Sequence, residues 1–215
     1  MKFYPSYSRV AQTLYNNYFR DKIDGFFIEC GASDGVSNNN CNFFEDRGWR
    51  GINIEPSQRL FSVLIKERNK SYLNLNVALS NTNGTATFKD IITEPGSMAA
   101  YDNGSLSHTK AHLKEIAGHG AKLFEIKVKT TTYTSLMLQY KIDHVDLLVL
   151  DVEGHELPVI EGMRLSTSLP DIICVEFGWA ALNDLKCALE GLGYKFDFVR
   201  DNNAFFIHKQ TVEKF

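Results

Sequence analysis

The stretch FFIECGASDGVSNNN, residues 26 to 40, decides the fold of this chain. The apolar run Phe26-Phe27-Ile28 is typical of a parallel strand buried on both faces, and Gly31 and Gly35 bracket the turn that follows it. A glycine has no Cβ, so positive φ costs little there and a ligand can approach the backbone closely. The stretch therefore predicts a strand, a turn and a helix built around a nucleotide-like cofactor.

A second strand-like run, GINIE at residues 51 to 55, ends twenty residues past Gly35 in the carboxylate of Glu55. An acidic residue at that distance is placed to accept hydrogen bonds from the hydroxyls of a cofactor ribose. Dinucleotide folds carry G-x-G-x-x-G, whereas Gly31 to Gly35 reads G-x-x-x-G without a third glycine. With Glu29 ahead of it, this spacing resembles the E-x-G-x-x-x-G loop of class I methyltransferases that bind S-adenosylmethionine. A plain turn from a strand into a helix has the same spacing and stays open as an alternative.

Length and composition point to one α/β domain spanning residues 1 to 215. The chain has 23 Lys and Arg against 26 Asp and Glu and no long basic run, which disfavours nucleic acid as an obligate partner. Cys30, Cys41, Cys174 and Cys187 form no C-x-x-C pair, as expected in a reducing cytoplasm. No apolar run reaches the roughly 20 residues that span a bilayer, and the N-terminus lacks an apolar signal core. We therefore expect a cytoplasmic protein without a membrane span.

Strand-like and helix-like segments alternate along the chain. The predicted strands are 26–30, 51–55, 72–78, 85–89, 124–130, 145–150 and 172–176, and the predicted helices are 38–47, 58–68, 133–141, 157–163 and 179–191. Such alternation predicts a doubly wound, Rossmann-like parallel sheet. Two final runs, 194–199 and 204–208, are joined by a short turn and must pair antiparallel. A mostly parallel seven-stranded sheet closed by a C-terminal hairpin is the class I methyltransferase fold, and ordinary dinucleotide folds lack that hairpin.

Two segments stand outside this rhythm. Residues 1 to 22 form an expected N-terminal helical extension, with a helix near 6–20 that acts as a lid or an oligomer contact. Residues 93 to 123 form an insertion with four glycines, few large aliphatic side chains and three histidines, His108, His112 and His119. Because a non-core insertion of this length is usually functional or disordered, we expect it to form part of the acceptor site. The alternative is that its histidines are solvated loop residues.

A cluster of acidic residues follows the strand that ends at residue 150. DVEGHE, residues 151 to 156, places three carboxylates and an imidazole at the edge that lines the ligand crevice of an open α/β sheet. Glu176 ends the neighbouring strand at the same edge. In the alternative interpretation, Asp151, Glu153 and Glu156 cap the next helix, where acidic residues are stabilising.

Six segments together resemble the FkbM family of methyltransferases. In order, across residues 25 to 178, they are FIECGASDG, GWRGINIEP, NVALSNTNGTATF, KVKTTTYTSL, DLLVLDVEGHELPVIEGM and IICVEF. DVEGHE with its trailing EG is the most diagnostic of these. The resemblance implies an S-adenosylmethionine-dependent O-methyltransferase that acts on a hydroxyl of a small-molecule or glycan acceptor, such as a sugar or natural product.

The resemblance also implies roles for individual residues. Glu29, Gly31 and the backbone of Ala32, Ser33, Asp34 and Gly35 would hold the methionine end of the cofactor, Glu55 before Pro56 the ribose, Val77 and Ala78 the adenine, and Asp151 the sulfonium end. One departure lies in the glycine loop, where relatives often read G-A-N-x-G and this chain has Ser33-Asp34. These side chains can satisfy the turn themselves. The insertion carries no transferable motif, so the acceptor is not identified.

The chemistry needs an acceptor oxygen held opposite the cofactor sulfur. A sugar hydroxyl is a poor nucleophile while protonated, so a general base or a cation that lowers its pKa assists the transfer. The candidate catalytic residues are Asp151, Glu153, His155 and Glu176. One hypothesis assigns proton removal to His155, Asp151 or a histidine of the insertion such as His108. The other has Asp151 and Glu176, with Glu153, bind a hard divalent cation such as Mg²⁺.

Two other functions remain open from the sequence alone. An NAD-dependent oxidoreductase would share the strand, the turn and Glu55, although the missing third glycine and the closing hairpin count against it. A non-catalytic binding protein would keep the fold without turnover, and the asparagine-rich segment 37–42 leaves room for it. Binding of NAD in place of S-adenosylmethionine would identify the oxidoreductase. Cofactor binding without methyl transfer to any acceptor would identify the binding protein.

Overall fold

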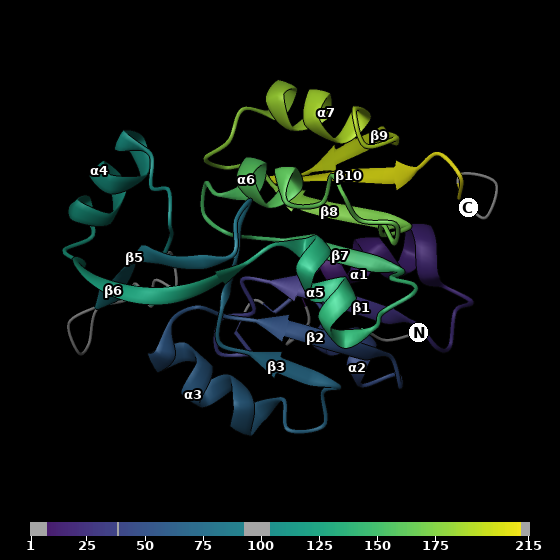
Figure 1. Cartoon of the computed structure of the whole chain (residues 1–215), viewed down its shortest axis with the longest axis horizontal. Helices are drawn as coiled ribbons and strands as arrows, with labels where there is room; N and C mark the ends of the chain where they lie inside the picture. Colours follow the sequence, from purple (N-terminus) through teal and green to yellow (C-terminus); the bar gives the residue numbers. More distant parts are fainter. Residues whose placement is uncertain (1–7, 38, 93–103, 212–215) are drawn as a thin grey trace.

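The computed structural model describes residues 8–37, 39–92 and 104–211 of the chain. Its main sheet has seven strands in the order β3 (Leu73–Leu75), β2 (Arg50–Ile54), β1 (Phe26–Cys30), β7 (Leu147–Leu150), β8 (Ile172–Glu176), β10 (Asn203–His208) and β9 (Tyr194–Arg200) (Figure 1). The first five strands are parallel, and β10 pairs antiparallel with both β8 and β9. The predicted fold, a mostly parallel seven-stranded sheet with a C-terminal antiparallel hairpin, is confirmed.

Both faces of the main sheet are buried, as the continuous apolar runs predict. Successive side chains of a strand point to opposite faces, so Phe27 enters one core cluster and its neighbour Ile28 the other, each at 0% exposure. On the side of Phe27 lie α1 (Arg9–Leu14), the π-helix η1 (Tyr15–Phe19) and α2 (Asn42–Glu45); on the side of Ile28 lie α5 (Tyr133–Tyr140), α6 (Glu156–Glu161) and α7 (Leu182–Glu190). A further helix, α3 (Gln58–Glu67), connects β2 to β3.

The N-terminal extension is part of the layer that covers the sheet. Its helix begins after Ser8, whose hydroxyl accepts a hydrogen bond from the Ala11 N–H at 3.0 Å. Phe19 in η1 packs edge-on against Phe44 and Trp49, with ring centroids 5.8 and 4.9 Å away. Residues 1–7 lie outside the described residues. The expected role as a lid or oligomer contact stays a prediction.

A second, three-stranded sheet leaves the carboxyl edge of the main sheet. It consists of β4 (Ala78–Leu79), β6 (Lys122–Thr131) and β5 (Gly84–Ile92) in that order. β5 and β6 form one long antiparallel hairpin, from the pair Gly84–Thr130 to the pair Ile92–Lys122. The expected strands 85–89 and 124–130 are therefore longer than predicted. The single expected strand 72–78 is two strands, β3 and β4, which belong to different sheets.

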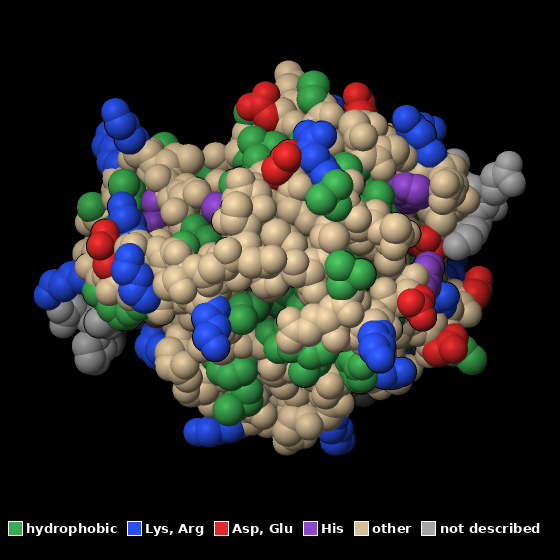
Figure 2. Space-filling model, viewed as in Figure 1, with side chains coloured by type: hydrophobic (Ala, Val, Ile, Leu, Met, Phe, Trp, Pro, Cys, Tyr) green, Lys and Arg blue, Asp and Glu red, His purple; other side chains and the backbone are tan. Residues whose placement is uncertain are grey.

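The expected insertion extends this hairpin, and its residues 93–103 lie outside the described residues. Ser105 bridges back to Lys89 of β5, and α4 (Lys110–Gly118) then begins after Thr109, whose hydroxyl caps it. Figure 1 shows α4 and the hairpin at the left. On the face drawn in Figure 2, Lys and Arg side chains are dispersed, with several over the hairpin and α4. None of the described helices is long and apolar enough to cross a membrane.

Candidate active site

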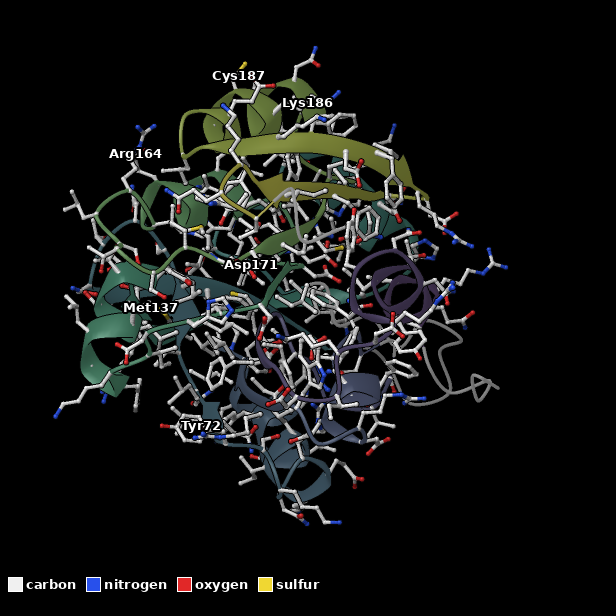
Figure 3. All side chains as sticks on the ribbon, turned by 90° about the vertical axis from the view of Figure 1, so that its right-hand side faces the viewer. Tyr72, Met137, Arg164, Asp171, Lys186 and Cys187 are labelled. Atoms are coloured by element: carbon white, nitrogen blue, oxygen red, sulfur yellow. The ribbon has the colours of Figure 1, made fainter. Side chains whose placement is uncertain are left out.

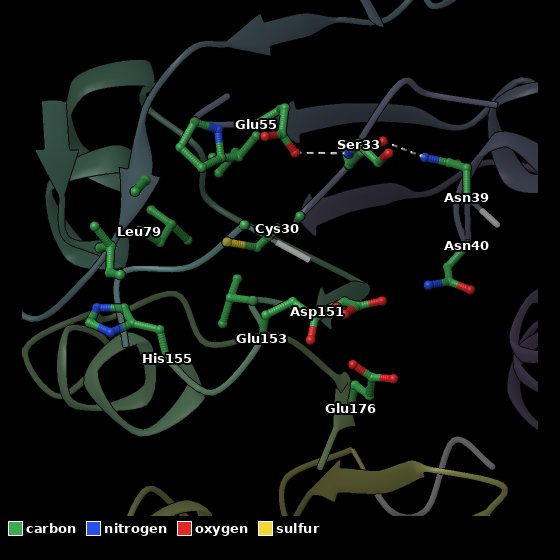
Figure 4. A pocket seen from close by; sticks show the side chains of 18 of the residues that line it. Cys30, Ser33, Asn39, Asn40, Glu55, Leu79, Asp151, Glu153, His155 and Glu176 are labelled. Atoms are coloured by element: carbon green, nitrogen blue, oxygen red, sulfur yellow. Dashed lines mark hydrogen bonds between the residues drawn. The ribbon is translucent and has the colours of Figure 1, made fainter. Parts of the chain in front are cut away.

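A cavity of about 410 Å³ lies at the carboxyl ends of β1, β2, β7 and β8, and its size suits a cofactor. Its lining combines the glycine loop, the ends of β2 and β7, and residues of the hairpin (Figure 4). The predicted site residues that line it are Gly31, Ala32, Ser33, Glu55, Pro56, Ala78, Asp151, Glu153, His155 and Glu176. The predicted residues Glu29, Asp34, Gly35 and Val77 do not line it.

The glycine loop is shaped by the protein's own packing. Gly31 has φ +88°, and a Cβ there would stand 1.8 Å from the carbonyl oxygen of Asp151 on the neighbouring strand end. Gly35 has φ +81°, and its Cβ would meet the side chains of Leu64 and Arg68. Asp34 closes the turn, because its carboxylate accepts hydrogen bonds from the N–H groups of Val36 and Ser37. These glycines therefore serve backbone geometry first, and the loop presents Gly31, Ala32 and Ser33 to the cavity.

Glu55 is held at the cavity wall by backbone donors. One carboxylate oxygen accepts the Ser33 N–H at 2.9 Å (Figure 4). The other accepts the Ser57 N–H at 2.7 Å. The carboxylate thus ties the end of β2 to the glycine loop after β1. It stands where the ribose of a cofactor is expected, and this role stays a prediction.

Glu29 does not line the cavity itself but holds two residues that do. Its carboxylate accepts hydrogen bonds from the side chain of Asn39 and the backbone of Asn40, both at 2.7 Å. Burial raises the pKa of Glu29, while Arg68 at 4.0 Å and these hydrogen bonds oppose that rise. Asn39 and Asn40 line the cavity in its place, and the sequence-based assignment missed them. Their position shortly after the glycine loop was the sequence feature that could have identified them as lining residues.

The cavity has an apolar end at the hairpin. Ala78, Leu79, Phe88 and Leu106 line it, the last two from β5 and from the described part of the insertion. Val77 instead packs against the core of the main sheet. The side chain next to Ala78 in the sequence thus points away from the cavity, as the alternation of an extended chain requires.

The opposite end of the cavity is acidic. Asp151 follows β7, Glu176 ends β8, and Glu153 lies in the turn between β7 and α6. Their carboxylate oxygens lie within 4.8 Å of one another, and Figure 4 shows the carboxylates of Asp151 and Glu176 facing each other. Burial, then repulsion from Glu176, raises the pKa of Asp151 well above its usual value and that of Glu153 to about 8. Among the described residues, no Lys or Arg forms an ion pair with any of the three.

Glu156 braces the turn that precedes α6. It is 1% exposed, and its carboxylate accepts hydrogen bonds from the N–H groups of Val152 and Gly154 within that turn. The turn that allows this has positive φ at Glu153 (56°) and Gly154 (96°). Glu156 therefore stabilises the turn that carries Glu153.

His155 joins three segments of the chain. Its Nε2 lies 3.0 Å from the hydroxyl of Ser80, and its Nδ1 lies 2.6 Å from the hydroxyl of Ser107 in the insertion. Burial lowers the pKa of His155 to about 4, so the ring is neutral at pH 7 and donates through one nitrogen while accepting through the other. To remove a proton from an acceptor, His155 would have to release one of these serines.

The insertion places a second aromatic group at the acidic end. The ring of His112 is 0% exposed and stacks on Trp179 with centroids 4.0 Å apart and an interplanar angle of 1°. Its Nε2 lies 3.8 Å from a carboxylate oxygen of Glu153, and neither ring nitrogen has a hydrogen-bond partner among the described residues. Burial, then the nearby His108, lowers the pKa of His112 to about 4. Sequence reasoning grouped His112 with two other histidines and could not see this stack.

A second cavity of about 370 Å³ adjoins the first. It is lined by Glu115, Glu153, Glu176, Gly178, Trp179 and Asn202. Glu153 and Glu176 line both cavities, so the acidic end of the first is a wall of the second. Glu115 comes from α4, which makes the insertion part of this second lining.

A parallel sheet closed by an antiparallel hairpin, with a cofactor-sized cavity at its carboxyl edge and an acidic residue ending β2, defines an S-adenosylmethionine-dependent class I methyltransferase. The chain belongs to the FkbM methyltransferase family, whose domain, described as Methyltransferase FkbM domain, matches residues 29–202. No curated protein matches the chain significantly.

Three solved structures are similar in fold. A TehB-like SAM-dependent methyltransferase from Corynebacterium glutamicum has 10% identity and a TM-score of 0.44, with 94% of this chain and 88% of that chain covered. The Methanococcus jannaschii fibrillarin pre-rRNA processing protein has 12% identity and a TM-score of 0.45, with 87% and 68% covered. The Escherichia coli protein yhhF, described as a methyltransferase, has 11% identity and a TM-score of 0.48, with 96% and 89% covered.

Proposed function

We propose that the chain is an S-adenosylmethionine-dependent O-methyltransferase that acts on a hydroxyl of a sugar, glycan or other natural product. The observation that carries this proposal is the wall that the two cavities share. Glu153 and Glu176 line both, so a cofactor in the first cavity and an acceptor in the second would meet at these carboxylates. Methyl transfer requires such an end-to-end approach of sulfur and oxygen.

The residues of the first cavity fit the cofactor in their chemistry. An apolar end with Ala78 and Phe88 suits the adenine, the carboxylate of Glu55 suits ribose hydroxyls, and the acidic end suits the positive charge of the sulfonium. When bound, the cofactor supplies a methyl group on that sulfur. The chain's own tasks are to hold the ribose with Glu55, to present the amides of Asn39 and Asn40 to the amino-acid part, and to keep Asp151 beside the sulfonium.

The lining of the second cavity supports a polyhydroxylated acceptor. Carboxylates and the side-chain amide of Asn202 suit hydroxyl groups, and Trp179 offers an aromatic surface to the C–H face of a sugar. Glu115 brings α4 into this lining, which supports a role for the insertion in acceptor binding. The carboxylates of Asp151, Glu153 and Glu176 are the groups nearest the expected oxygen and the favoured proton acceptors. His155 then acts as a positioning residue, because both its nitrogens hold serine hydroxyls.

Calorimetric titration with S-adenosylhomocysteine, and separately with NAD, tests the cofactor. We expect binding of the first at about micromolar Kd, near −8 kcal/mol, and none of NAD. Glu55→Ala should abolish that binding, whereas Glu190→Ala, an exposed change at the end of α7, should not alter it. Binding of NAD in place of the homocysteine product would overturn the proposal.

Transfer itself is tested with cofactor carrying a labelled methyl group and a panel of sugars, glycosides and natural products. We expect the label in a base-stable ether on the acceptor. Cofactor binding without transfer to any compound of the panel would favour the non-catalytic alternative.

The proposed location is the cytoplasm. The four cysteines of the chain are free thiols, which supports this location. Measuring the location of a tagged chain tests it.

A further inference from the structure

Within residues 8–37, 39–92 and 104–211, no Lys or Arg forms an ion pair with the acidic end of the cofactor cavity. The carboxylate oxygens of Asp151, Glu153 and Glu176 lie within 4.8 Å of one another, and Asp151 and Glu176 are hydrogen-bonded to each other. Two carboxylates make such a bond by sharing a proton, which is how an acidic pair compensates when no cation is beside it. This convergence alone does not make a metal site, because acidic side chains gather for other reasons.

A second observation lies on the insertion side of the cluster. The fully buried His112 directs Nε2 toward a carboxylate oxygen of Glu153 at 3.8 Å, and both atoms lack a hydrogen-bond partner among the described residues. Their separation is too long for a hydrogen bond. It falls within the roughly 3 to 4 Å that separates two ligands which each stand about 2.1 Å from one small cation. The stack on Trp179 fixes the ring in this direction.

The protonation state of the His112 imidazole is also the one that metal binding requires. A metal ligand must be the neutral form of histidine, and His112 is neutral because burial opposes its protonation. A water molecule could satisfy one nitrogen, but it would leave the three carboxylates to be neutralised by protons rather than by a cation. A cation satisfies the imidazole and the carboxylates together.

We propose that Asp151, Glu153 and Glu176 bind a divalent metal cation, with His112 as a fourth ligand from the insertion. This inference rests on the proposed function, since the cation would lie between the two cavities and coordinate the acceptor oxygen. A hydroxyl held by a divalent cation ionises at lower pH, which prepares it for methylation. Carboxylates favour Mg²⁺ and Mn²⁺, and one imidazole among them shifts the choice toward Mn²⁺.

The test measures Mn²⁺ alone on the full chain, without cofactor or acceptor. The protein is first treated with a chelator, and free Mn²⁺ is then followed by electron paramagnetic resonance and by calorimetry. We expect one site per chain that binds at roughly micromolar to submillimolar concentration. Glu176→Gln should weaken it at least tenfold, and His112→Phe, which keeps the aromatic stack, should weaken it less.

Asp171→Asn is the matched control. Asp171 belongs to a different acidic cluster, with His144 and Asp146, at the other edge of the sheet. It should leave Mn²⁺ binding unchanged, and circular dichroism and thermal unfolding check that each variant folds. Failure of the native chain to bind Mn²⁺ at millimolar concentration would overturn the metal site. So would binding that Asp171→Asn abolishes and Glu176→Gln leaves intact.

These results stand apart from the outcome for the proposed function. Stoichiometric Mn²⁺ binding that depends on Glu176 supports the metal site even when no acceptor is methylated. Methyl transfer that persists in excess chelator, by a chain that binds no Mn²⁺, overturns the metal site and leaves the methyltransferase proposal intact.

Discussion

Two acidic clusters stand at opposite ends of the same pair of strands, β7 and β8. Asp146 and Asp171 immediately precede these strands at the amino edge, whereas Asp151 and Glu176 stand at their carboxyl ends. Figure 3 shows Asp171 on the side of the molecule that lies at the right in Figure 1, and α4 lies at the left in Figure 1. The strands are the same, so the difference between the clusters comes from what surrounds them.

The amino-edge cluster is neutralised from within. The carboxylate of Asp146 accepts the Phe26 N–H at 2.8 Å and lies 3.1 Å from both Lys22 and His144. In the carboxyl-edge cluster the carboxylates repel one another instead. Two full negative charges about 4 Å apart repel by about 4 kcal/mol at an effective dielectric constant of about 20. A cluster that carries its own cation is part of the scaffold. A cluster without one is stable only when it is protonated or binds a cation from outside.

The largest effect should come from breaking the carboxyl-edge cluster. Glu176→Gln keeps the shape of the side chain but removes a charge that both cavities share. We expect kcat/KM for methyl transfer to fall about a hundredfold or more, in line with the loss of a positioned proton acceptor or cation ligand. Thermal unfolding of the metal-free variant should be unchanged or slightly higher, because repulsion is relieved. Equal losses of stability and activity would show that Glu176 is scaffold.

The amino-edge cluster should respond in the opposite way. Asp146→Ala removes a buried carboxylate and leaves the Phe26 N–H and the partly exposed Lys22 without their partner, and we expect a loss of about 1 to 3 kcal/mol in the free energy of unfolding. Denaturant titration measures this loss. The kcat of the folded fraction should stay within about twofold of the native value, since no atom of this cluster lines either cavity.

The pH dependence of stability sharpens the comparison. The pKa of Glu153 is raised to about 8 in the folded chain, so between about pH 4.5 and 8 the folded state binds more protons than the unfolded state. Stability of the metal-free chain should therefore fall as pH rises through that window. The contribution is about 1 to 3 kcal/mol, and Glu153→Gln should remove it. Denaturant midpoints at pH 5 and pH 8.5 for both proteins measure it; an unchanged slope in the variant would contradict the assignment.

The smallest effect should come from the cation of the amino edge. Lys22 is 40% exposed at its side chain, so its ion pair with Asp146 is screened by solvent. Lys22→Met should cost about 0.5 to 1 kcal/mol, and less in high salt. Unfolding at low and high ionic strength checks this, with Lys195→Met on β9 as a control for the loss of one exposed charge.

The sequence predicted the parts of the fold that depend on local patterns. β1 was predicted at its observed limits, and the C-terminal hairpin followed from two apolar runs and a short turn. The strand expected at 72–78 failed because its second half pairs elsewhere. Asn76 turns the chain by donating to the carbonyl oxygens of Glu55 and Pro56, and Ala78 then pairs with Thr130 of β6. That partner lies more than fifty residues later, beyond the reach of any local pattern.

In the candidate site, too, the residues that follow from local sequence patterns were predicted and those that depend on long-range contacts were not. Glu55, Asp151 and Glu176 were predictable because each lies at the end of a parallel strand or directly after it, at the carboxyl edge of the sheet, and all three line the cavity. Asn40 and His112 were not singled out, because their positions depend on contacts with Glu29 and Trp179 that only the folded chain creates. Their functional roles, like those of the other site residues, stay predictions.

The hairpin of β5 and β6 is joined to the rest of the molecule in an unusual manner. It shares no ladder with the seven-stranded sheet within the described residues, and it pairs only with the two-residue β4. Side chains also attach it: the Ser57 hydroxyl donates a hydrogen bond to Asp90 of β5 at 2.6 Å. The insertion is held separately, by the contact between His155 Nδ1 and the Ser107 hydroxyl. Sequence changes in the hairpin and its insertion therefore alter the lining of the cofactor cavity, to which Phe88 and Leu106 belong, without removing a strand from the seven-stranded sheet.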